Sequence, residues 1–364
     1  MRPGAETLLA RGHPPDPRAS RTASLRASST TMRAPGLRAS GTTSREEGNE
    51  MRVTAVVVTY NRRHLLLESL AAVLAQSRAP DAVIVVDNAS EDGTAGAVRA
   101  AFPGVQLAEL ARNSGGAGGF AAGMALALAG DADHIWLMDD DTVPEPGALG
   151  ALLAAQERMT AQSPAPARPP ALIASRVLWT DRREHPMNTP RPKPFAAKAE
   201  RDAAAAAGCV PIRSASFVSV LVDVAECRRR GLPRAAYFLW NDDFEFTTRL
   251  LRGNTGLLCP ASVVVHKTKT FGSTDVDPGD RFFYEVRNKI WMFRDRAPLA
   301  PLERLAYGGS TLRRWARTFA GSRDRRALSS SLVRGIAAGV RTRPRPTDEV
   351  LADAGLLVPA RNQD

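Results

Sequence analysis

The stretch Val53-Thr54-Ala55-Val56-Val57-Val58-Thr59 decides the fold, because it is a continuous run of β-branched and small apolar residues. Such a run is typical of a strand that is buried on both faces. Residues 82–86 (Ala-Val-Ile-Val-Val) and 134–138 (His-Ile-Trp-Leu-Met) have the same character. Between the first two runs, leucines at 66, 70 and 74 predict one helix over residues 62–76. The sequence therefore begins its ordered part with a strand–helix–strand pattern.

The same alternation continues along the chain. We predict further strands at 105–110, 171–178 and 217–222. A short helix is predicted to end near residue 101, and three more helices are predicted at 118–128, 148–159 and 244–251. Strands that alternate with helices at this spacing join in right-handed βαβ units around a parallel sheet. The prediction is an α/β, Rossmann-like fold in which a mostly parallel sheet is flanked by helices.

The composition is that of a globular protein. Of 364 residues, 44% are hydrophobic and 24% are charged, which excludes a wholly disordered or fibrous chain. The three cysteines have neither a CxxC nor a Cys/His spacing, so we expect no zinc site and no disulfide framework. The first 50 residues lack the apolar centre of a signal peptide, and no apolar run is long enough to span a bilayer. We therefore expect a cytoplasmic protein, either soluble or peripheral to a membrane.

The net charge of +11 comes from the two ends of the chain, with eight arginines in residues 1–45 and eleven in residues 301–346. Residues 1–50 have no hydrophobic period, which predicts a disordered basic arm. Alternatively, Met51 is the true start and the arm is not part of the native protein. Residues 51–298 contain the predicted α/β domain. Residues 299–346 are predicted as a basic helical extension, and residues 347–364 as a tail.

The basic extension has an amphipathic pattern, because Leu305, Leu312, Trp315 and Phe319 share one face of a predicted helix. With Arg313, Arg314 and Arg317 around it, this face suits the surface of an anionic membrane. The alternative is that the helix packs on the α/β domain and leaves its arginines in water. A second unassigned segment, residues 181–208, contains four prolines and is predicted as a loop that carries a short helix.

Polar clusters follow the predicted strands at their carboxyl ends, where open α/β sheets bind their ligands. The clearest is the triple acid Asp139-Asp140-Asp141, which directly follows a buried strand. Three adjacent carboxylates repel one another and need either full solvation or a cation. Because alternate residues of an extended segment point the same way, Asp139 and Asp141 can share one divalent ion and leave Asp140 for another partner. A solvated turn that caps the next helix is the alternative.

A second acidic motif, Trp240-Asn241-Asp242-Asp243-Phe244-Glu245-Phe246, places carboxylates between large apolar residues. Burial beside such residues raises the pKa of an acid toward the range of a general base. The alternative is a helix N-terminus that Asp242 or Asp243 caps. His266 ends a further apolar run, and Lys267 and Lys269, which follow it, would suit a phosphate-bearing ligand.

The glycine-rich segment from Asn113 to Phe120 includes a loose match to a dinucleotide-binding fingerprint. Such a fingerprint normally follows the first strand, with its acid at the end of the second. Here the glycines come after the third strand. A turn that lets the backbone approach a ligand therefore fits better than NAD(P) binding.

Taken together and in this order, these motifs resemble those of inverting GT-A glycosyltransferases of family two, over about residues 52–295. The motifs are 57–62 (Val-Val-Thr-Tyr-Asn-Arg), 85–90 (Val-Val-Asp-Asn-Ala-Ser), Asn113 with its glycines, Asp139 to Asp141, Asp242 to Glu245 and His266. With Arg281-Phe282-Phe283-Tyr284, the combination is similar to the rhamnosyltransferase and galactofuranosyltransferase branch. This branch extends polyprenyl-diphosphate-linked glycans for cell-wall or surface polysaccharides. The resemblance implies a GT-A fold with a helical, basic C-terminal extension.

The resemblance also implies roles for individual residues. It assigns the donor nucleotide sugar to Thr59, Asn61, Asp87, Asn113, Gly115, Gly116 and Asp140. It assigns a Mn or Mg ion to Asp139, Asp141 and His266, catalysis to Asp243 as the base, and acceptor binding to Trp240, Asp242, Lys267 and Lys269. Two features depart from the family pattern, namely Asn241, where an acid or small residue is frequent, and the segment 181–208.

The implied partners are a nucleotide-sugar donor, a lipid-linked glycan acceptor and the inner face of the plasma membrane, with no nucleic acid. An oxidoreductase that binds a nucleotide sugar or NAD(P) through the glycine-rich segment is the main alternative. A nucleic-acid-binding protein with basic ends is less consistent with the acidic strand ends, which would repel phosphates. The sequence leaves the donor sugar, the acceptor linkage and the oligomeric state open.

Overall fold

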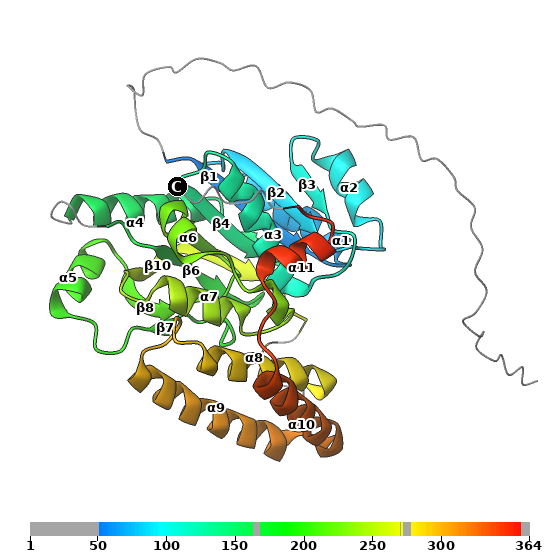
Figure 1. Ribbon diagram of the computed structural model, residues 1–364. Coiled ribbons are helices and arrows are strands. Elements are labelled where there is room, and N and C mark those ends of the chain that lie inside the picture. The colour runs from blue at the N-terminus through cyan, green and yellow to red at the C-terminus, as the bar shows by residue number, and fades with distance from the viewer. Residues whose placement is uncertain (1–50, 163–167, 270, 272–277, 358–364) are drawn as a thin grey trace, which may run out of the picture. The chain divides into compact units, whose positions relative to one another are not determined.

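A ten-stranded sheet with the order β3-β2-β1-β4-β9-β6-β10-β8-β7, in which β5 also pairs with β10, organises the described part of the chain. The computed structural model describes residues 51–162, 168–269, 271 and 278–357 (Figure 1). These residues all belong to one compact unit. The predicted arm at residues 1–50 lies outside them. The prediction of a mostly parallel sheet flanked by helices is confirmed.

The first half of the sheet is parallel and matches the predicted strands. It consists of β1 (Val53–Thr59), β2 (Ala82–Asp87), β3 (Gln106–Glu109) and β4 (His134–Asp139). All residues of β1 are buried, as the β-branched run predicts for a strand between two layers. Because these strands are parallel, their carboxyl ends bring Thr59, Asp87 and Asp139 to one edge of the sheet.

The second half of the sheet is mixed. It consists of β5 (Thr142–Pro144), β6 (Leu172–Leu178), β7 (Arg191–Pro192), β8 (Val210–Ser214), β9 (Val220–Asp223) and β10 (Gly256–His266). Strand β9 runs antiparallel between β4 and β6, while β10 runs parallel to β6. Strand β5 turns back from β4 and pairs antiparallel with the end of β10, so that Thr142 lies opposite His266.

Helices cover both faces of the sheet. One layer consists of α1 (Arg63–Leu74), α2 (Thr94–Ala101), α4 (Ala148–Gln162) and α5 (Lys198–Ala206), and the other of α3 (Gly115–Ala129), α6 (Val224–Arg230), α7 (Asp242–Leu250) and α11 (Thr347–Asp353). The strand period of two divides β1 between these layers. Val57 packs with Leu66 and Leu70 of α1, whereas Val56 and Val58 pack in the same core as α3.

The glycine-rich segment is part of a helix rather than a turn before one, because α3 begins at Gly115 instead of residue 118. The helix lies close against the sheet. A Cβ atom at Gly119 or Gly123 would lie 2.4 or 2.3 Å from a methyl group of Val58 or Val56. At Gly115, φ is +71°, and a Cβ atom would lie 2.0 Å from the carbonyl oxygen of Phe238. These glycines permit close packing that any side chain would obstruct.

The C-terminal extension is helical, with α9 (Pro301–Gly321) and α10 (Arg325–Arg341). These two helices are grouped with α8 (Phe282–Arg294), which precedes the extension, below the sheet in the view of Figure 1. Helix α10 packs on α8 through Gly335 and Gly339. The short helices η1 (Ala235–Tyr237) and η2 (Gly279–Arg281) complete the described elements. Within these elements, no helix is both long and apolar enough to cross a membrane.

The predicted apolar face of α9 is divided in two. Trp315 and Phe319 contact Phe282 of α8, with ring centroids 5.9 and 5.8 Å apart. Leu305 and Leu312 instead remain 76% and 65% exposed. The region that we predicted as a tail returns to the sheet as α11, where Leu351 is buried in the core against α3. Residues 358–364 of that region lie outside the described residues.

Candidate active site

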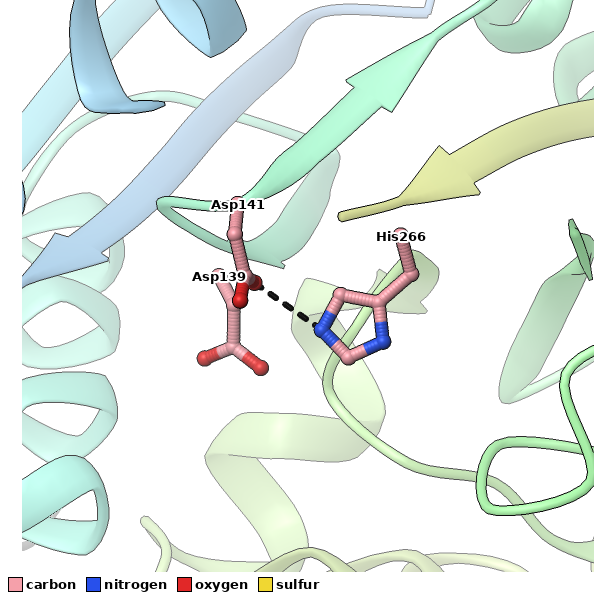
Figure 2. A group of neighbouring side chains, drawn as sticks. All are labelled: Asp139, Asp141 and His266. Carbon is pink, nitrogen blue, oxygen red and sulfur yellow. Dashed lines mark ion pairs between the residues drawn. The ribbon is translucent and has the colours of Figure 1, made fainter. Parts of the chain in front are cut away.

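Asp139, Asp141 and His266 meet at the carboxyl edge of the sheet, with one ligand atom from each within 4.8 Å of the other two (Figure 2). The meeting follows from the topology. Strand β4 ends at Asp139, and the reversal into β5 places Asp141 beside the end of β10. The backbone N–H of Lys267 donates to the Asp141 carbonyl at 2.8 Å, which holds the two segments together. As a result, the His266 Nε2 atom lies 2.9 Å from Asp141 Oδ1.

This cluster fits a divalent cation. Burial, followed by the charges of Asp141 and Asp140, raises the pKa of Asp139 well above its usual value, so the charged form of Asp139 is costly without a positive partner. Burial also acts to raise the pKa of Asp141, but the contact with His266 and the charge of Arg62 outweigh it and lower that pKa. Two carboxylates suit Mg or Mn, and an imidazole nitrogen suits a transition metal. The donor set is therefore consistent with the predicted Mn or Mg site.

Asp140 points to different partners from its two neighbours. The hydroxyl of Thr59 donates to Asp140 Oδ2 at 2.8 Å, and Arg62 donates to Oδ1 at 3.2 Å. Burial raises the pKa of Asp140 to about 6 despite the charge of Arg62. The same guanidinium contacts Asp141 Oδ2 at 2.7 Å. Arg62 thus connects the end of β1 to the acidic cluster.

The second acidic pair begins helix α7. Asp242 is buried, and this burial, followed by the charge of Asp243, raises the pKa of Asp242 to about 8. The charge of Asp242 also contributes to the raised pKa of Asp139, so the two acidic motifs lie within electrostatic range of each other. Burial raises the pKa of Asp243 as well, but the Phe244 N–H at 2.6 Å and the charges of Lys289 and Arg191 oppose this effect.

The backbone before α7 adopts an uncommon conformation. Phe238, Trp240 and Asn241 have φ values of 63°, 65° and 64°, in a region that residues other than glycine rarely adopt. The amide of Asn288 donates to the carbonyl of Trp240 at 2.9 Å, and the Asn241 amide donates to Glu285 at 2.7 Å. The family departure at Asn241 therefore has a physical reason, since asparagine tolerates left-handed backbone and here also binds a buried acid.

The residues predicted for the nucleotide lie at the ends of β1 and β2 and at the start of α3. Asn61 Oδ1 accepts from the N–H of Glu91 at 2.8 Å, and Asp87 Oδ1 accepts from that of Ser90 at 2.9 Å. Asn113 Oδ1 accepts from Gly115 at 2.7 Å. Gly116 differs from Gly115 because, apart from its chain neighbours and the backbone of its own helix, no atom of the described residues lies within 4 Å of the position of a Cβ.

The predicted acceptor lysines are not part of the acidic pair at α7. Lys267 pairs with Glu68 of α1, and Lys269 is exposed. Two other cations, Lys289 and Arg191, lie close enough to Asp243 for their charges to act against the rise of its pKa. Lys289 Nζ and the Arg191 guanidinium lie 4.4 and 5.2 Å from the centroid of the Phe244 ring. Burial lowers the pKa of Lys289 to about 8.

Sequence reasoning did not assign Arg62, Arg191 or Glu285 to the site, nor Asn188, whose Oδ1 atom lies 2.8 Å from Nδ1 of His266. It considered Lys289 only as one polar residue of the aromatic stretch 281–289, which forms either a polar wall of a site or a helix with a charged face. Arg62 had a usable signal, because it follows Asn61 in the cluster at the end of β1. Arg191 and Asn188 had none, since both lie in the segment 181–208, where no motif was visible. Glu285 and Lys289 lie four residues apart on α8, which places them on one helix face but does not say which element that face contacts.

The comparisons with known proteins identify the family of this chain. A model of the family described as Glycosyl transferase family 2 matches residues 54–221. Galactofuranosyltransferase GlfT1 of Mycobacterium tuberculosis (strain ATCC 25618 / H37Rv) is 31% identical in an alignment 257 residues long, which covers 64% of this chain and 79% of that protein. The chain belongs to glycosyl transferase family 2. Another relative, Galactofuranosyltransferase GlfT1 of Mycolicibacterium smegmatis, is 53% identical over 93 residues, but the match spans only 25% of this chain and 30% of that relative.

Solved structures show the same fold. TarS of S. aureus superimposes with a TM-score of 0.53 at 16% identity, over 83% of this chain and 50% of TarS. TarS 1–349 in complex with UDP-GlcNAc gives a TM-score of 0.51 at 17% identity, over 83% and 84% of the two chains. At these identities the likeness shows the GT-A fold alone. The family assignment makes the protein a glycosyltransferase and leaves the dinucleotide-binding alternative without support.

Proposed function

We propose that this glycosyltransferase moves a galactofuranose or rhamnose residue from a nucleotide-diphosphate donor to a polyprenyl-diphosphate-linked glycan, with inversion at the anomeric carbon. The convergence of Asp139, Asp141 and His266 near the acidic pair of α7 carries the proposal. The similarity to GlfT1 favours galactofuranose as the sugar. A protein with the same fold, TarS 1–349, binds UDP-GlcNAc, which is consistent with a nucleotide-sugar donor.

In this mechanism, Asp139, Asp141 and His266 would hold a Mn or Mg ion. When bound, the ion would neutralise the charge that develops on the departing diphosphate. Asp243 removes the proton from the acceptor hydroxyl, whose oxygen then attacks the anomeric carbon from the side opposite the departing nucleoside diphosphate. Because the Asp242 pKa of about 8 keeps this acid largely protonated near pH 7, Asp242 can donate a hydrogen bond to the acceptor. Trp240 and the cations Lys267 and Lys269 would contribute to the acceptor side.

On the donor side, Thr59, Asn61 and Asp87 would line the pocket of the nucleoside, and Asp140 would position the donor. Asn113 and Gly116, with Gly115, would lie along the ribose and diphosphate. The open space at Gly116 supports this placement, because a backbone without a side chain there can approach a ligand.

The donor is identified by the mass of the product. The protein is incubated with Mn²⁺, a short polyprenyl-diphosphate-linked glycan and either UDP-galactofuranose, dTDP-rhamnose or UDP-GlcNAc. We expect a mass increase of one hexose with UDP-galactofuranose and little product with UDP-GlcNAc. Transfer from dTDP-rhamnose instead would support the same mechanism and identify rhamnose, rather than galactofuranose, as the sugar that is transferred. Absence of transfer from all three donors would contradict the proposed activity.

We also propose that α9 and α10 contact the inner face of the plasma membrane, where the lipid-linked acceptor is located. On α9, Leu302, Leu305 and Leu312 are 81%, 76% and 65% exposed, and on α10, Val333 and Val340 are 66% and 56% exposed. Exposed arginines lie among them, at 313, 317, 326 and 341. Apolar residues mixed with arginines suit the interface of an anionic bilayer.

Vesicle co-sedimentation tests this contact. Each arginine near an anionic surface contributes about 1 kcal/mol, so the double variant Arg313→Gln and Arg317→Gln is expected to bind phosphatidylglycerol vesicles about 30-fold more weakly. The double variant Leu305→Glu and Leu312→Glu should also lose binding. Neutral phosphatidylcholine vesicles are the control and should bind weakly in every case. Equal binding of the wild type and both variants would contradict the membrane contact.

A further inference from the structure

The segment 181–208, which the sequence analysis left without a role, reaches His266, one of the three proposed metal ligands. Its residue Asn188 is 6% exposed, and the Asn188 Oδ1 atom lies 2.8 Å from Nδ1 of His266. His266 is itself buried and presents its other nitrogen, Nε2, to Asp141. The imidazole is thus held between an amide from this segment and a carboxylate of the acidic cluster.

The surroundings of Asn188 fix the orientation of its amide. The Asn188 Nδ2 group donates to the hydroxyl of Ser216 at 3.1 Å, so Oδ1 is the atom that faces His266. The backbone N–H of Asn188 donates to the carbonyl of His185 at 3.0 Å, and the His185 N–H donates to Val177 of β6 at 3.0 Å. The segment is therefore anchored to the sheet, and Asn188 does not depend on a long unsupported loop.

An amide oxygen can only accept a hydrogen bond, so this arrangement requires the proton of a neutral His266 to be on Nδ1. The Nε2 atom then has a free lone pair, which is what a metal ligand needs. The other tautomer has a competing partner in this site. A proton on Nε2 would donate to Asp141 Oδ1 at 2.9 Å and would block both atoms from a cation.

We propose that Asn188 is a positioning residue that holds His266 in the Nδ1-protonated tautomer and so makes Nε2 available to the divalent cation. The inference rests on the proposed function, because it assumes that Asp139, Asp141 and His266 bind the ion of the transfer reaction. A hydrogen bond to the second nitrogen of a ligating histidine fixes the ring and its tautomer, and loss of such a partner costs about 10–100-fold in metal affinity.

The first test is the affinity for Mn²⁺ alone, measured by isothermal titration calorimetry without substrate. Asn188→Leu keeps the approximate volume but has no acceptor, and we expect it to bind Mn²⁺ about 10–100-fold more weakly than the wild type. Asn188→Asp keeps an acceptor oxygen and should recover most of the affinity. Thr189→Val is the matched control, because it removes a side-chain hydrogen bond of the same segment, from the Thr189 hydroxyl to the His185 carbonyl at 3.2 Å, and leaves the Asn188 amide and its partners unchanged; it should bind Mn²⁺ as the wild type does. Thermal unfolding of each variant checks that it is folded.

The second test reads the tautomer directly in metal-free protein labelled with ¹⁵N-histidine, at a pH where the imidazole is neutral. The two nitrogen resonances of His266, assigned with His266→Gln, should show the proton on Nδ1 in the wild type and a shift toward Nε2 in Asn188→Leu. Wild-type protein with the proton on Nε2 would overturn the proposal even if no variant folds. So would Asn188→Leu protein that binds Mn²⁺ as tightly as the wild type.

The two proposals fail in distinguishable ways. Wild-type protein that binds no Mn²⁺ or Mg²⁺ would contradict the metal site of the proposed function. If the wild type binds Mn²⁺ and Asn188→Leu binds it with the same affinity, only the role of Asn188 is contradicted.

Discussion

Asp243→Asn is expected to lower the rate of sugar transfer by about 10²- to 10⁴-fold, which is the usual contribution of a general base. Asparagine has nearly the same shape and can still accept from the Phe244 N–H that binds Asp243 Oδ1 at 2.6 Å. It cannot take a proton from the acceptor hydroxyl. The measurement is single-turnover transfer with saturating donor and acceptor, so that weaker binding does not obscure the loss of the chemical step.

The neighbouring acid provides the matched control. The pKa of Asp242 is about 8, so this residue is largely protonated near pH 7 and asparagine can imitate the protonated form. Asp242→Asn is therefore expected to lower the rate of sugar transfer by less than about tenfold, which corresponds to about 1.4 kcal/mol in activation free energy. The charges of Lys289 and Arg191 favour ionised Asp243, which makes it the better base of the pair. A larger loss in Asp242→Asn than in Asp243→Asn would reverse the assignment.

The pH dependence gives an additional check on the same residue. Because burial raises the pKa of Asp243, protonation of the base on acidification begins at a higher pH than for an ordinary aspartate. The transfer rate of the wild type should fall as the pH is lowered through this pKa. The residual activity of Asp243→Asn should lack that acidic fall.

Asp141→Ala is the second variant with a large expected effect, with a loss in kcat/KM of about 10³-fold, or about 4 kcal/mol. One oxygen of Asp141 contacts His266 Nε2 and the other contacts Arg62. Removal of the carboxylate therefore breaks the link between His266 on β10 and Arg62 after β1. Loss of this proposed ligand would weaken the binding of the cation at the position where the diphosphate acquires charge. Transfer as a function of Mn²⁺ concentration measures the effect, and excess metal should recover only part of it.

Asp140→Asn is the control for Asp141→Ala, because it changes the adjacent acid but leaves the three proposed ligands. Its partners are Thr59 and Arg62 rather than His266. We expect a raised KM for the donor and an unchanged dependence on Mn²⁺. An Asp141→Ala enzyme with wild-type activity, or wild-type activity that survives a strong chelator, would exclude the proposed role of the metal.

Unlike β3, which is only partly buried, the strands β1, β2 and β4 of the parallel half could be predicted from the sequence because nearly all of their residues are buried. Each then appears as an uninterrupted apolar run, as in β1. The sequence could not show that β5 reverses and pairs with β10, although this pairing brings Asp141 to His266. It contained the ligands but not the contact between them, which depends on residues more than a hundred positions apart.

The errors at α3 and α11 have a common origin, since both depend on packing against elements distant in sequence. Glycine is a poor helix former in isolation, so a segment with several glycines predicts a turn. In α3 the first residues pack against Phe238, to whose carbonyl the Ala117 N–H donates at 3.2 Å, and the helix begins at Gly115, three residues before the predicted start. Helix α11 is short and polar at its start, and only its contact with α3 distinguishes it from a tail.

The chemistry-bearing residues of the candidate site were largely visible in the sequence, because Asp139, Asp141, Asp243 and His266 stand at the ends of recognisable elements. Their supporting residues were not. Arg62 is visible only as the last residue of a motif, and Asn188 lies in a segment without periodicity. Such residues act through a single contact with another element, and a pattern of residue types does not reveal that contact.

The most direct test of the central claim is a calorimetric titration of UDP into the wild-type protein with and without Mn²⁺. If Asp139, Asp141 and His266 hold one cation that contacts the diphosphate, UDP binds much more tightly with Mn²⁺, at one ion per protein. Asp141→Ala and His266→Ala should each abolish this increase. Equal affinity for UDP with and without the metal would contradict the account.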